Sequence, residues 1–334
     1  MQHPEWKDDE GSIAPHPFPF QHVGMSAITA VSCERPATLL RDWLASHRRI
    51  FALTGAGIST ASGIPDYRGA DGQWKRRAPI TWQAFVNDPA MRARYWARSF
   101  VGWPMVARAL PNRGHAALAT LEARGRLTTL VTQNVDGLHT RAGQRAVVDL
   151  HGRIDQVVCL ACATRIPRST IQQRLADAHP EWTTIYGSPD KSIQDLSRQV
   201  HPYTAGTSEP VQRFPGAITA PDGDADLEDT DLRDFRPPSC PECGGMLKPD
   251  VVFFGENVPR ERFEAARAAL DAADAVLVVG SSLMVYSGFR FARMAREAGL
   301  PLAILTRGVT RADHLATLKL DEECETALAD AVGQ

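Results

Sequence analysis

Short apolar runs alternate with amphipathic stretches along most of the chain. Four runs are apolar for about the length of one strand, and each leads into a polar or glycine-containing segment: 49–55, 127–134, 275–282 and 301–308. Such short uniform runs are typical of strands buried on both faces of a sheet. Residues 36–47 and 287–299 place apolar side chains at helical spacing, and Gly299 is suited to end the second helix.

Strands that alternate with helices predict an α/β fold with a doubly wound, mainly parallel, Rossmann-like sheet, into which a smaller zinc-binding module is inserted. The predicted parts are a flexible leader at 1–32, a discontinuous sheet domain at 33–154 and 247–330, a small module at 155–246 with a helical part at about 70–115, and a long insertion at about 183–236.

Composition narrows the class of protein. The chain of 334 residues is 43% hydrophobic with a net charge of −2, which argues against a protein that binds nucleic acid mainly through phosphate contacts. No segment approaches the roughly 18 apolar residues of a membrane span, and the first residues lack the features of a signal or transit peptide. We therefore expect a cytoplasmic monomer with no membrane partner and no specific nucleic-acid partner.

Four of the six cysteines form two Cys-x-x-Cys pairs, Cys159 with Cys162 and Cys240 with Cys243. In a cytoplasmic chain, two such pairs predict one structural zinc site with four thiolate ligands. Two separate redox pairs are the alternative, but each would be expected at the head of a helix, and "CPECGGMLKP" is typical of a turn. The 77 residues from 163 to 239 exceed the usual spacing between pairs, so an insertion must lie inside the module.

The segment "LTGAGISTASGIPDYRG" (53–69) begins like a dinucleotide-binding turn. Gly55 and Gly57 fit the glycine pattern, whereas Thr60 occupies the place of the third glycine. An oxidoreductase would also need an acidic residue about 20 positions further on to hold a ribose, and that region is basic here. The sequence therefore favours pyrophosphate binding without hydride transfer.

Further polar residues follow the strand predicted at 127–134. Gln133, Asn134 and Asp136 can hydrogen-bond a ribose or a carboxamide at that strand end. His151 lies directly before the first cysteine pair and hence near the junction of the two modules. A lone histidine is more often structural than catalytic, and we keep the structural interpretation for His115 and His139.

Taken together, these motifs resemble the sirtuins, which are NAD-dependent protein deacylases. The resemblance runs from about residue 33 to 330 through "GAGIS", "SGIPDYRG", "TQNVDGLH", "LHG", the two cysteine pairs, "LKPDVVFFGE" and "GSSL", in that order. The stretches "RYWARSFVGWP", "LKPDVVFFGE" and "GSSLMVYSGFRF" are further similar to the class II, sirtuin-4-like branch.

The resemblance implies a site for NAD as co-substrate and one structural zinc. His151, Asn134 and Asp136 would be catalytic, while Thr306 stands where relatives usually carry asparagine. The residues implied to bind NAD are Gly55, Ala56, Gly57, Ser59, Asp66, Tyr67, Arg68, Gln133, Asn134, Asp136, Gly280, Ser281, Ser282, Thr306, Arg307, Gly308 and Cys324.

The implied reaction removes an acyl group from a lysine of a protein or peptide. The acyl oxygen attacks the ribose carbon that carries nicotinamide, nicotinamide leaves, and His151 acts as general base on a ribose hydroxyl, so that lysine and O-acyl-ADP-ribose are released. An imidazole with an ordinary pKa near 6.5 suits this role. Mono-ADP-ribosyl transfer by the same site, an NAD-linked oxidoreductase and a non-catalytic zinc-module protein are the alternatives.

Two extended edges, 251–256 and 282–288, are implied to hold the substrate backbone between them as an added strand. The residues involved are Val252, Phe253, Phe254, Gly255, Glu256 and Val285.

Tyr95 and Arg98 share one helix face and resemble the Tyr-x-x-Arg pattern that binds an acyl carboxylate in desuccinylating sirtuins. With Trp96, Phe100 and Trp103 as walls, we expect acyl groups bulkier or more acidic than acetyl to be preferred. The acidic run 222–231 lacks the glycine and glutamate of a calcium loop and is expected to be solvated.

Overall fold

The computed structural model describes residues 36–75, 79–186, 221–225, 227, 232 and 234–333. The predicted leader at 1–32 and most of the insertion at 183–236 lie outside these residues. Residues 35–334 form one unit, within which the elements below are arranged.

A six-stranded parallel sheet lies at the centre of this unit, in the order β3-β2-β1-β7-β8-β9. All four predicted buried strands are confirmed and occupy the inner positions, whereas the two edge strands, each of three residues, were not predicted. The strands are β1 (Ile50–Thr54), β2 (Leu127–Thr132), β3 (Val147–Asp149), β7 (Ala275–Val279), β8 (Leu302–Leu305) and β9 (Leu318–Leu320).

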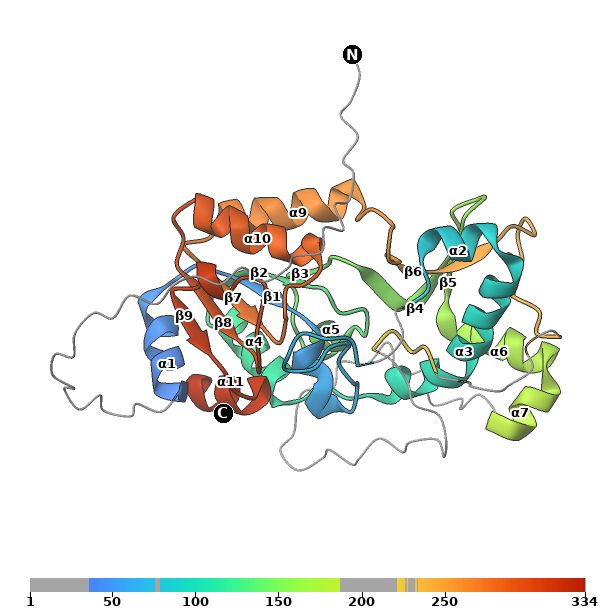
Figure 1. Cartoon of the computed structure of the whole chain (residues 1–334), viewed down its shortest axis with the longest axis horizontal. Coiled ribbons are helices and arrows are strands. Elements are labelled where there is room, and N and C mark those ends of the chain that lie inside the picture. The colour runs from blue at the N-terminus through green and yellow to red at the C-terminus, as the bar shows by residue number, and fades with distance from the viewer. Residues whose placement is uncertain are drawn as a thin grey trace, which may run out of the picture. The chain divides into compact units, whose positions relative to one another are not determined.

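Helices cover both faces of this sheet (Figure 1). Ile50 and Ala52 of β1 pack on one side and Phe51 and Leu53 on the other, so every side chain of the strand is buried. One face carries α1 (Pro36–Ser46), α4 (Arg113–Ala123) and α11 (Cys324–Val332), and the other carries α9 (Arg260–Asp271) and α10 (Tyr286–Glu297). The predicted helices 36–47 and 287–299 are thus confirmed as α1 and α10.

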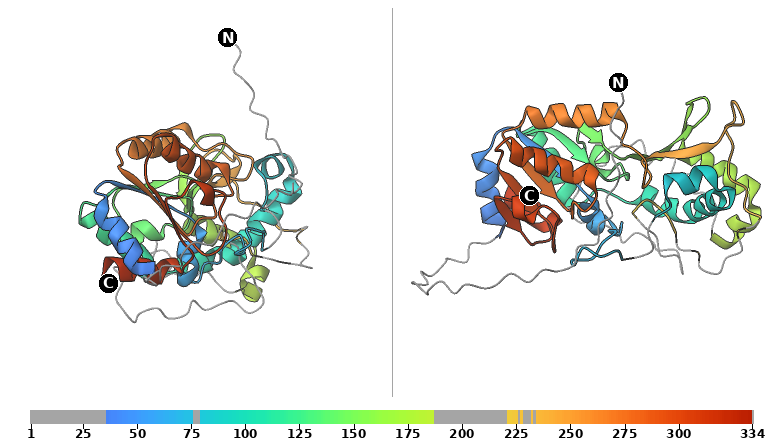
Figure 2. Two further views of the ribbon diagram at one scale, coloured as in Figure 1. Left: turned by 60° about the vertical axis from the view of Figure 1, so that its left-hand side comes forward. Right: turned by 45° about the horizontal axis from the view of Figure 1, so that its top comes forward.

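A second, three-stranded antiparallel sheet has the order β5-β4-β6 and its own hydrophobic core (Figure 2). Its strands are β4 (Gly152–Cys159), β5 (Arg165–Pro167) and β6 (Leu247–Val251), and the helices that share this core are α2 (Trp82–Asn87), α3 (Pro89–Arg108), α6 (Arg168–Ala178) and α7 (Pro180–Tyr186). Three short elements complete the described chain, η1 (Ala56–Ser62), α5 (Leu138–Arg141) and η2 (Asp313–Leu315). Among the described helices, none combines the length and the apolar character needed to cross a bilayer.

Helix α3 carries two of the predicted substrate residues. Asp88 caps it, since its Oδ1 accepts hydrogen bonds from the backbone of Ala90 (2.8 Å) and Met91 (3.2 Å). From Tyr95 to Val106 nearly every residue is buried, because α3 packs against β4 on one side and against described residues of the insertion on another. A helix that is enclosed in this way holds its side chains in fixed positions.

The backbone at the junction of the two sheets requires glycine at position 152. Gly152 opens β4 with φ +84°, and a Cβ atom there would lie 2.0 Å from the carbonyl oxygen of Asp250. We expect Gly152→Ala to lower the free energy of unfolding by about 3 kcal/mol or more, because backbone strain and a backbone clash act together.

Gly125 is the matched control for this substitution. Its φ is +69°, yet a Cβ atom on Gly125 would have no neighbouring atom within 4 Å. Gly125→Ala should therefore cost only the conformational strain, about 1 kcal/mol. Urea denaturation of both variants checks the difference, and equal losses would contradict the steric explanation.

Candidate functional site

The residues predicted to bind the nucleotide gather at one edge of the large sheet, because parallel strands end on the same side. They follow β1 (Gly55, Ala56, Gly57, Ser59), β2 (Gln133, Asn134, Asp136), β7 (Gly280, Ser281, Ser282) and β8 (Thr306, Arg307, Gly308), and Cys324 opens α11. The structure therefore places together residues that are up to about 270 positions apart in the chain.

The glycine loop after β1 lies directly against the loop after β7. The backbone N–H of Gly57 donates to the carbonyl of Gly280 at 2.8 Å. A Cβ atom on Gly55 would lie 2.7 Å from Ser281 Cβ, and one on Gly57 would lie 2.9 Å from Gly280. This close approach of backbones is the feature that a pyrophosphate cradle requires, so the loop fits a dinucleotide.

A hydrogen-bond network connects the ends of β1 and β2. The side-chain amide of Asn134 donates to the carbonyl of Gly55 and to Ser59 Oγ, both at 3.1 Å. Ser59 Oγ in turn donates to Asp136 Oδ2 at 2.7 Å, while Asp136 Oδ1 accepts from the backbone of Leu138 at 2.9 Å. These bonds orient the amide and the carboxylate, both predicted to contact the ribose or carboxamide.

The loops after β7 and β8 differ in exposure. Ser281 Oγ accepts a hydrogen bond from Gln133 Nε2 at 2.8 Å. Thr306 is buried, whereas Arg307 is exposed and forms an ion pair with Glu323 at 2.7 Å. The backbone of Gly308 donates to Asp321 Oδ1 at 2.8 Å. Of the three residues at 306–308 that are predicted to bind NAD, Thr306 therefore has the buried side chain.

Cys324 is a buried thiol whose Sγ donates to the carbonyl of Leu305 at 3.5 Å. Burial raises the pKa of Cys324 to about 12, so the group stays a neutral thiol.

The segment with Asp66, Tyr67 and Arg68 is held by contacts within its own loop. Asp66 forms an ion pair with Lys75, and Arg68 donates to the carbonyl of Gly72 at 2.8 Å and lies 4.1 Å above the ring of Trp74. Burial, followed by the charge of Asp222, raises the pKa of Tyr67. Of these three side chains, Tyr67 is the one that contacts the insertion.

His151 has hydrogen-bond partners on both ring nitrogens. Nδ1 lies 3.0 Å from the carbonyl oxygen of Gln133, and Nε2 lies 2.7 Å from Ser287 Oγ. Because a carbonyl can only accept, Nδ1 must carry the proton, and Nε2 is then a free acceptor for the Ser287 hydroxyl. Burial lowers the pKa of His151 to about 4, with Arg290 and Arg262 acting in the same direction, while the bond to Gln133 opposes this shift.

His151 is therefore a neutral base at neutral pH, with its basic nitrogen directed at a hydroxyl group. Sequence reasoning found His151 but missed Ser287. The only signal for Ser287 was its place in the first turn of α10, directly after "GSSLMVY".

His115 and His139 keep their structural interpretation. Their rings lie 4.7 Å apart, and burial lowers the pKa of each to about 3.

The segment Val252–Glu256 is fixed next to His151. The backbone of Val252 donates to the carbonyl of His151 at 2.8 Å, and Trp82 donates to the carbonyl of Phe254 at 2.9 Å. Glu256 accepts from Phe253 N at 2.8 Å and from Lys248 Nζ at 2.7 Å, which closes the turn that includes Gly255.

The second predicted edge, 282–288, is only partly extended. Val285 has an extended backbone, but Leu283 has φ +55° and Tyr286, Ser287 and Gly288 form the first turn of α10, so the prediction is wrong for these four residues. Helical spacing there brings Ser287 to His151, which an extended edge would not do.

Tyr95 and Arg98 do share one face of α3, and both contact other parts of the chain. The Tyr95 ring is buried and lies 5.4 Å from Phe85 and 5.2 Å from Phe253. Arg98 Nε lies 2.6 Å from Asp224 Oδ1, an ion pair whose side chains are 18% and 15% exposed. The guanidinium on which the predicted acyl carboxylate depended is therefore already engaged.

The expectation of a solvated acidic run is wrong for its first residues. Asp222 receives a hydrogen bond from Tyr67, and Asp224 pairs with Arg98, so both carboxylates are enclosed. Burial and the neighbouring Asp222 raise the pKa of Asp224 to about 7. Residues 226, 228–231 and 233 lie outside the described part of the chain.

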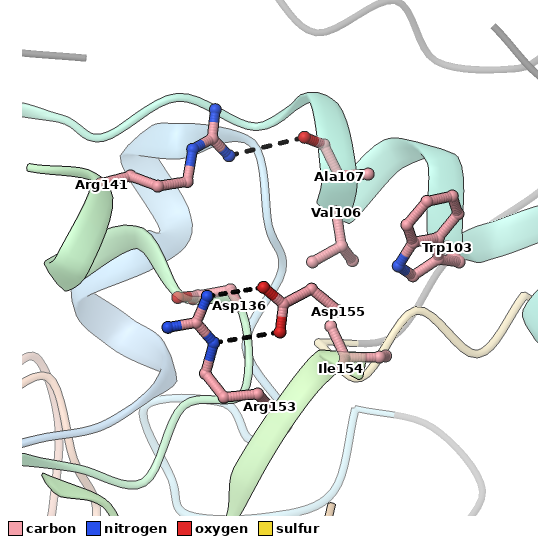
Figure 3. Close-up of a pocket in the computed structure, with 8 residues that line it drawn as sticks. All are labelled: Trp103, Val106, Ala107, Asp136, Arg141, Arg153, Ile154 and Asp155. Atoms are coloured by element: carbon pink, nitrogen blue, oxygen red, sulfur yellow. Dashed lines mark hydrogen bonds and ion pairs between the residues drawn. The ribbon is translucent and has the colours of Figure 1, made fainter. Parts of the chain in front are cut away.

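A small, partly open pocket adjoins Asp136 (Figure 3). Arg153 forms an ion pair with Asp155 at 2.6 Å, and Arg141 donates to the backbone carbonyl of Ala109 at 2.6 Å. The other lining residues are Trp103, Val106, Ala107 and Ile154.

Only one of the three aromatic residues predicted to wall an acyl pocket lines this cavity. Trp103 does so, whereas Trp96 and Phe100 are buried in the core of the small module, near Arg168 and Trp182. Helical periodicity does not say which partner a helix face packs against, so the acyl wall expected from Trp96 and Phe100 stays a prediction.

Four thiols meet at one end of the small sheet. All ligand atoms of Cys159, Cys162, Cys240 and Cys243 lie within 4.8 Å of one another, with Sγ–Sγ distances of 3.5 Å (Cys159–Cys243) and 3.7 Å (Cys162–Cys240). Tetrahedral zinc with Zn–S bonds of about 2.3 Å would separate its ligands by about 3.8 Å. The four cysteines are thus positioned to bind a zinc ion, and two independent redox pairs are not what the structure shows.

Comparison with known proteins agrees with this geometry. The model of the Sir2 family matches residues 55–287. An NAD-dependent protein deacetylase of Xanthomonas axonopodis pv. citri (strain 306) is 53% identical over 302 residues, which cover 90% of this chain and 92% of that protein. One from Bordetella bronchiseptica (strain ATCC BAA-588 / NCTC 13252 / RB50) is 52% identical over 293 residues, or 88% and 96% of the two chains.

Among solved structures, a complex described as Sir2-p53 peptide-NAD+ superposes with a TM-score of 0.61 at 27% identity, covering 89% of this chain and 96% of that one. The parallel sheet with its glycine loop, the four clustered thiols and these matches have one explanation: the chain belongs to the Sir2 family, the sirtuins.

Proposed function

We propose that this sirtuin is an NAD-dependent protein lysine deacylase. The reaction converts an acyl-lysine, NAD and water into lysine, nicotinamide and O-acyl-ADP-ribose. The similar proteins named above are NAD-dependent protein deacetylases, and one similar structure is a complex with a peptide and NAD+. The observation that carries the proposal is the neutral imidazole of His151, which lies at the edge where the nucleotide loops meet. Its Nε2 atom is 2.7 Å from the hydroxyl group of Ser287.

The residues of the chain divide the work. The loops after β1, β7 and β8 would hold NAD, which supplies nicotinamide as a leaving group and ADP-ribose as the acyl acceptor. Asn134 and Asp136 orient the ribose and the carboxamide, and Nε2 of His151 accepts the hydroxyl proton. Val252–Glu256 and Val285 bind the substrate backbone as an added strand, which explains affinity with little dependence on peptide sequence.

We further propose membership of the class II, sirtuin-4-like branch and a preference for acyl groups bulkier or more acidic than acetyl. Support for bulkier groups comes from the apolar rings of Tyr95 and Phe253, while the pairing of Arg98 with Asp224 leaves the acidic part of this preference to experiment. Mono-ADP-ribosyl transfer, a cytoplasmic location and a monomeric state stay predictions. An oxidoreductase is disfavoured because Thr60 and the missing ribose acid do not fit hydride transfer.

Removal of the base provides the first functional test. His151→Ala should lower kcat for formation of the deacylated lysine by roughly 100-fold or more, because a general base contributes on that scale. Calorimetric titration with NAD and the thermal midpoint should stay near those of the native protein. Turnover close to native would mean that another group takes the proton, and formation of NADH would contradict the proposed reaction.

The Ser287 hydroxyl should tune His151. The bond to Nε2 stabilises the neutral imidazole, so Ser287→Ala should raise the pKa of His151, by about 0.7 unit if the bond is worth ~1 kcal/mol. Since protonated His151 cannot accept a proton, kcat/KM should then decline at a higher pH on the acidic side. Ser287→Thr should restore the native profile, and superimposable profiles for all three proteins would contradict this role.

Zinc should hold the small module together. Metal analysis of the purified protein should give about one zinc per chain, and Cys162→Ser should lose the metal and lower the thermal midpoint, because structural zinc contributes folding energy. Cys324→Ser is the matched control, since this buried thiol lies outside the four-cysteine cluster, and it should retain the metal. A folded native protein without zinc would refute the assignment.

A further inference from the structure

We propose that the first turns of α10 bind an acidic segment of the substrate protein beside the acyl-lysine. The residues of this surface, which we call the arginine surface, are Arg290, Arg293, Arg311, Tyr286 and Val309. This inference rests on the proposed deacylase function and adds to it the class of protein substrate, one that carries carboxylates close to the modified lysine.

The arginine surface begins next to the proposed base. Ser287 lies 2.7 Å from Nε2 of His151, and Arg290, one turn later, donates from Nε to the carbonyl of Ser287 at 3.3 Å. At about 100° per residue, Arg290 projects between Tyr286 and Ser287 around the helix axis, while Arg293 lies about 9 Å along the axis from Ser287. An extended peptide advances about 3.3 Å per residue, so residues within about three positions of the acyl-lysine can reach both arginines.

Aromatic rings, rather than carboxylates, support two of these guanidinium groups. Arg290 lies 4.4 Å from the ring centroid of Phe263, and Arg311 lies 4.4 Å from that of Phe289. Within the described residues neither arginine forms an ion pair, and the hydrogen bonds of both go to backbone carbonyls. Because stacking uses the flat face of a guanidinium, its in-plane N–H groups remain available to a carboxylate.

Positive charge is concentrated on this surface although the chain as a whole has a net charge of −2. Arg293 pairs with Glu297, but at 3.6 Å and with side chains that are 50% and 65% exposed, so the pair contributes little and can be replaced by a partner's carboxylate. The ring of Tyr286 lies 5.9 Å from the guanidinium of Arg290 and 6.0 Å from that of Arg293. An acidic segment is therefore complementary to this surface in charge.

Exposed apolar side chains accompany the arginines. Val285, Tyr286 and Val309 are 38%, 50% and 52% exposed. The two segments that carry them are adjacent, because the backbone of Arg311 donates to the carbonyl of Ser282 at 2.9 Å. Arginine and tyrosine are enriched at protein interfaces. Together with the exposed valines, they are typical of a docking surface rather than of a helix face that contacts only solvent.

The test uses pairs of acetyl-lysine peptides that differ only in three flanking residues, which are aspartate in one peptide and asparagine in the other. One pair carries these residues before the lysine and a second pair carries them after it. At low salt the native protein should show a kcat/KM about fivefold higher for the aspartate peptide on at least one side, through a lower KM, because two exposed ion pairs contribute on this scale. High salt should reduce this preference by screening the charges.

Matched variants make the result specific. Arg290→Gln combined with Arg293→Gln should remove the preference, whereas Arg290→Lys combined with Arg293→Lys retains the charge and should keep most of it. Arg267→Gln removes an arginine from an exposed ion pair with Asp271 on α9 and should leave the ratio unchanged. Arg290 also affects the pKa of His151, so the readout is the ratio between the two peptides and not the rate on either one. Thermal midpoints show whether each variant is folded.

The outcomes separate this inference from the proposed function. Binding of the labelled peptides, measured by fluorescence polarisation, tests the arginine surface without turnover, so failure to release nicotinamide with any acyl peptide would refute the deacylase alone. Equal kcat/KM and equal affinity for the aspartate and asparagine peptides on both sides would overturn the inference. A preference that survives both glutamine substitutions would also overturn it. Tighter binding of a single-stranded oligonucleotide than of the aspartate peptide, lost in the same variants, would assign the surface to nucleic acid instead.

Discussion

The parallel pairing of β1 with both β2 and β7 is the constraint on which the site depends. With a strand on each side and helices on both faces, all five residues of β1 are buried. The position of its carboxyl end is therefore fixed between the ends of β2 and β7. Thr54 at that end donates its hydroxyl to Thr132 of β2 at 2.9 Å. The three loops that follow these strands must therefore meet, and the glycines at 55, 57 and 280 allow them to touch.

Local pattern was sufficient for the parts of the fold that are buried on both faces. The inner strands β1, β2, β7 and β8 could be predicted because burial of every side chain leaves a uniformly apolar run. The edge strands β3 and β9 could not, since each has three residues that are mostly half-buried and carry no such run. Similarly, the spacing of the four cysteines predicted a metal site without any knowledge of the fold.

What sequence could not supply were contacts between distant segments. The ion pair of Arg98 with Asp224 joins a helix to an insertion more than a hundred residues away. The sequence around either residue does not indicate that the other is its partner. The assignment of Arg98 to an acyl carboxylate stays a prediction, whereas the expected solvation of the acidic run is wrong for Asp222 and Asp224. Ser287 was missed for a related cause, because its significance lies in facing His151 across the site.

The residues of the site come from different parts of the fold. Asn134 and Asp136 follow strands of the large sheet, and His151 is held through the carbonyl of Gln133 at the end of β2. Tyr95 and Arg98 belong instead to a helix whose partners lie in the small module and its insertion.

A backbone hydrogen bond from Val252 to the carbonyl of His151 connects the residues at the large sheet with those of the small module. A change in the insertion can therefore alter the surroundings of Arg98 while the bonds that orient His151 remain in place. Because a buried ion pair is sensitive to the loss of either partner, the pair of Arg98 with Asp224 fixes the insertion to α3.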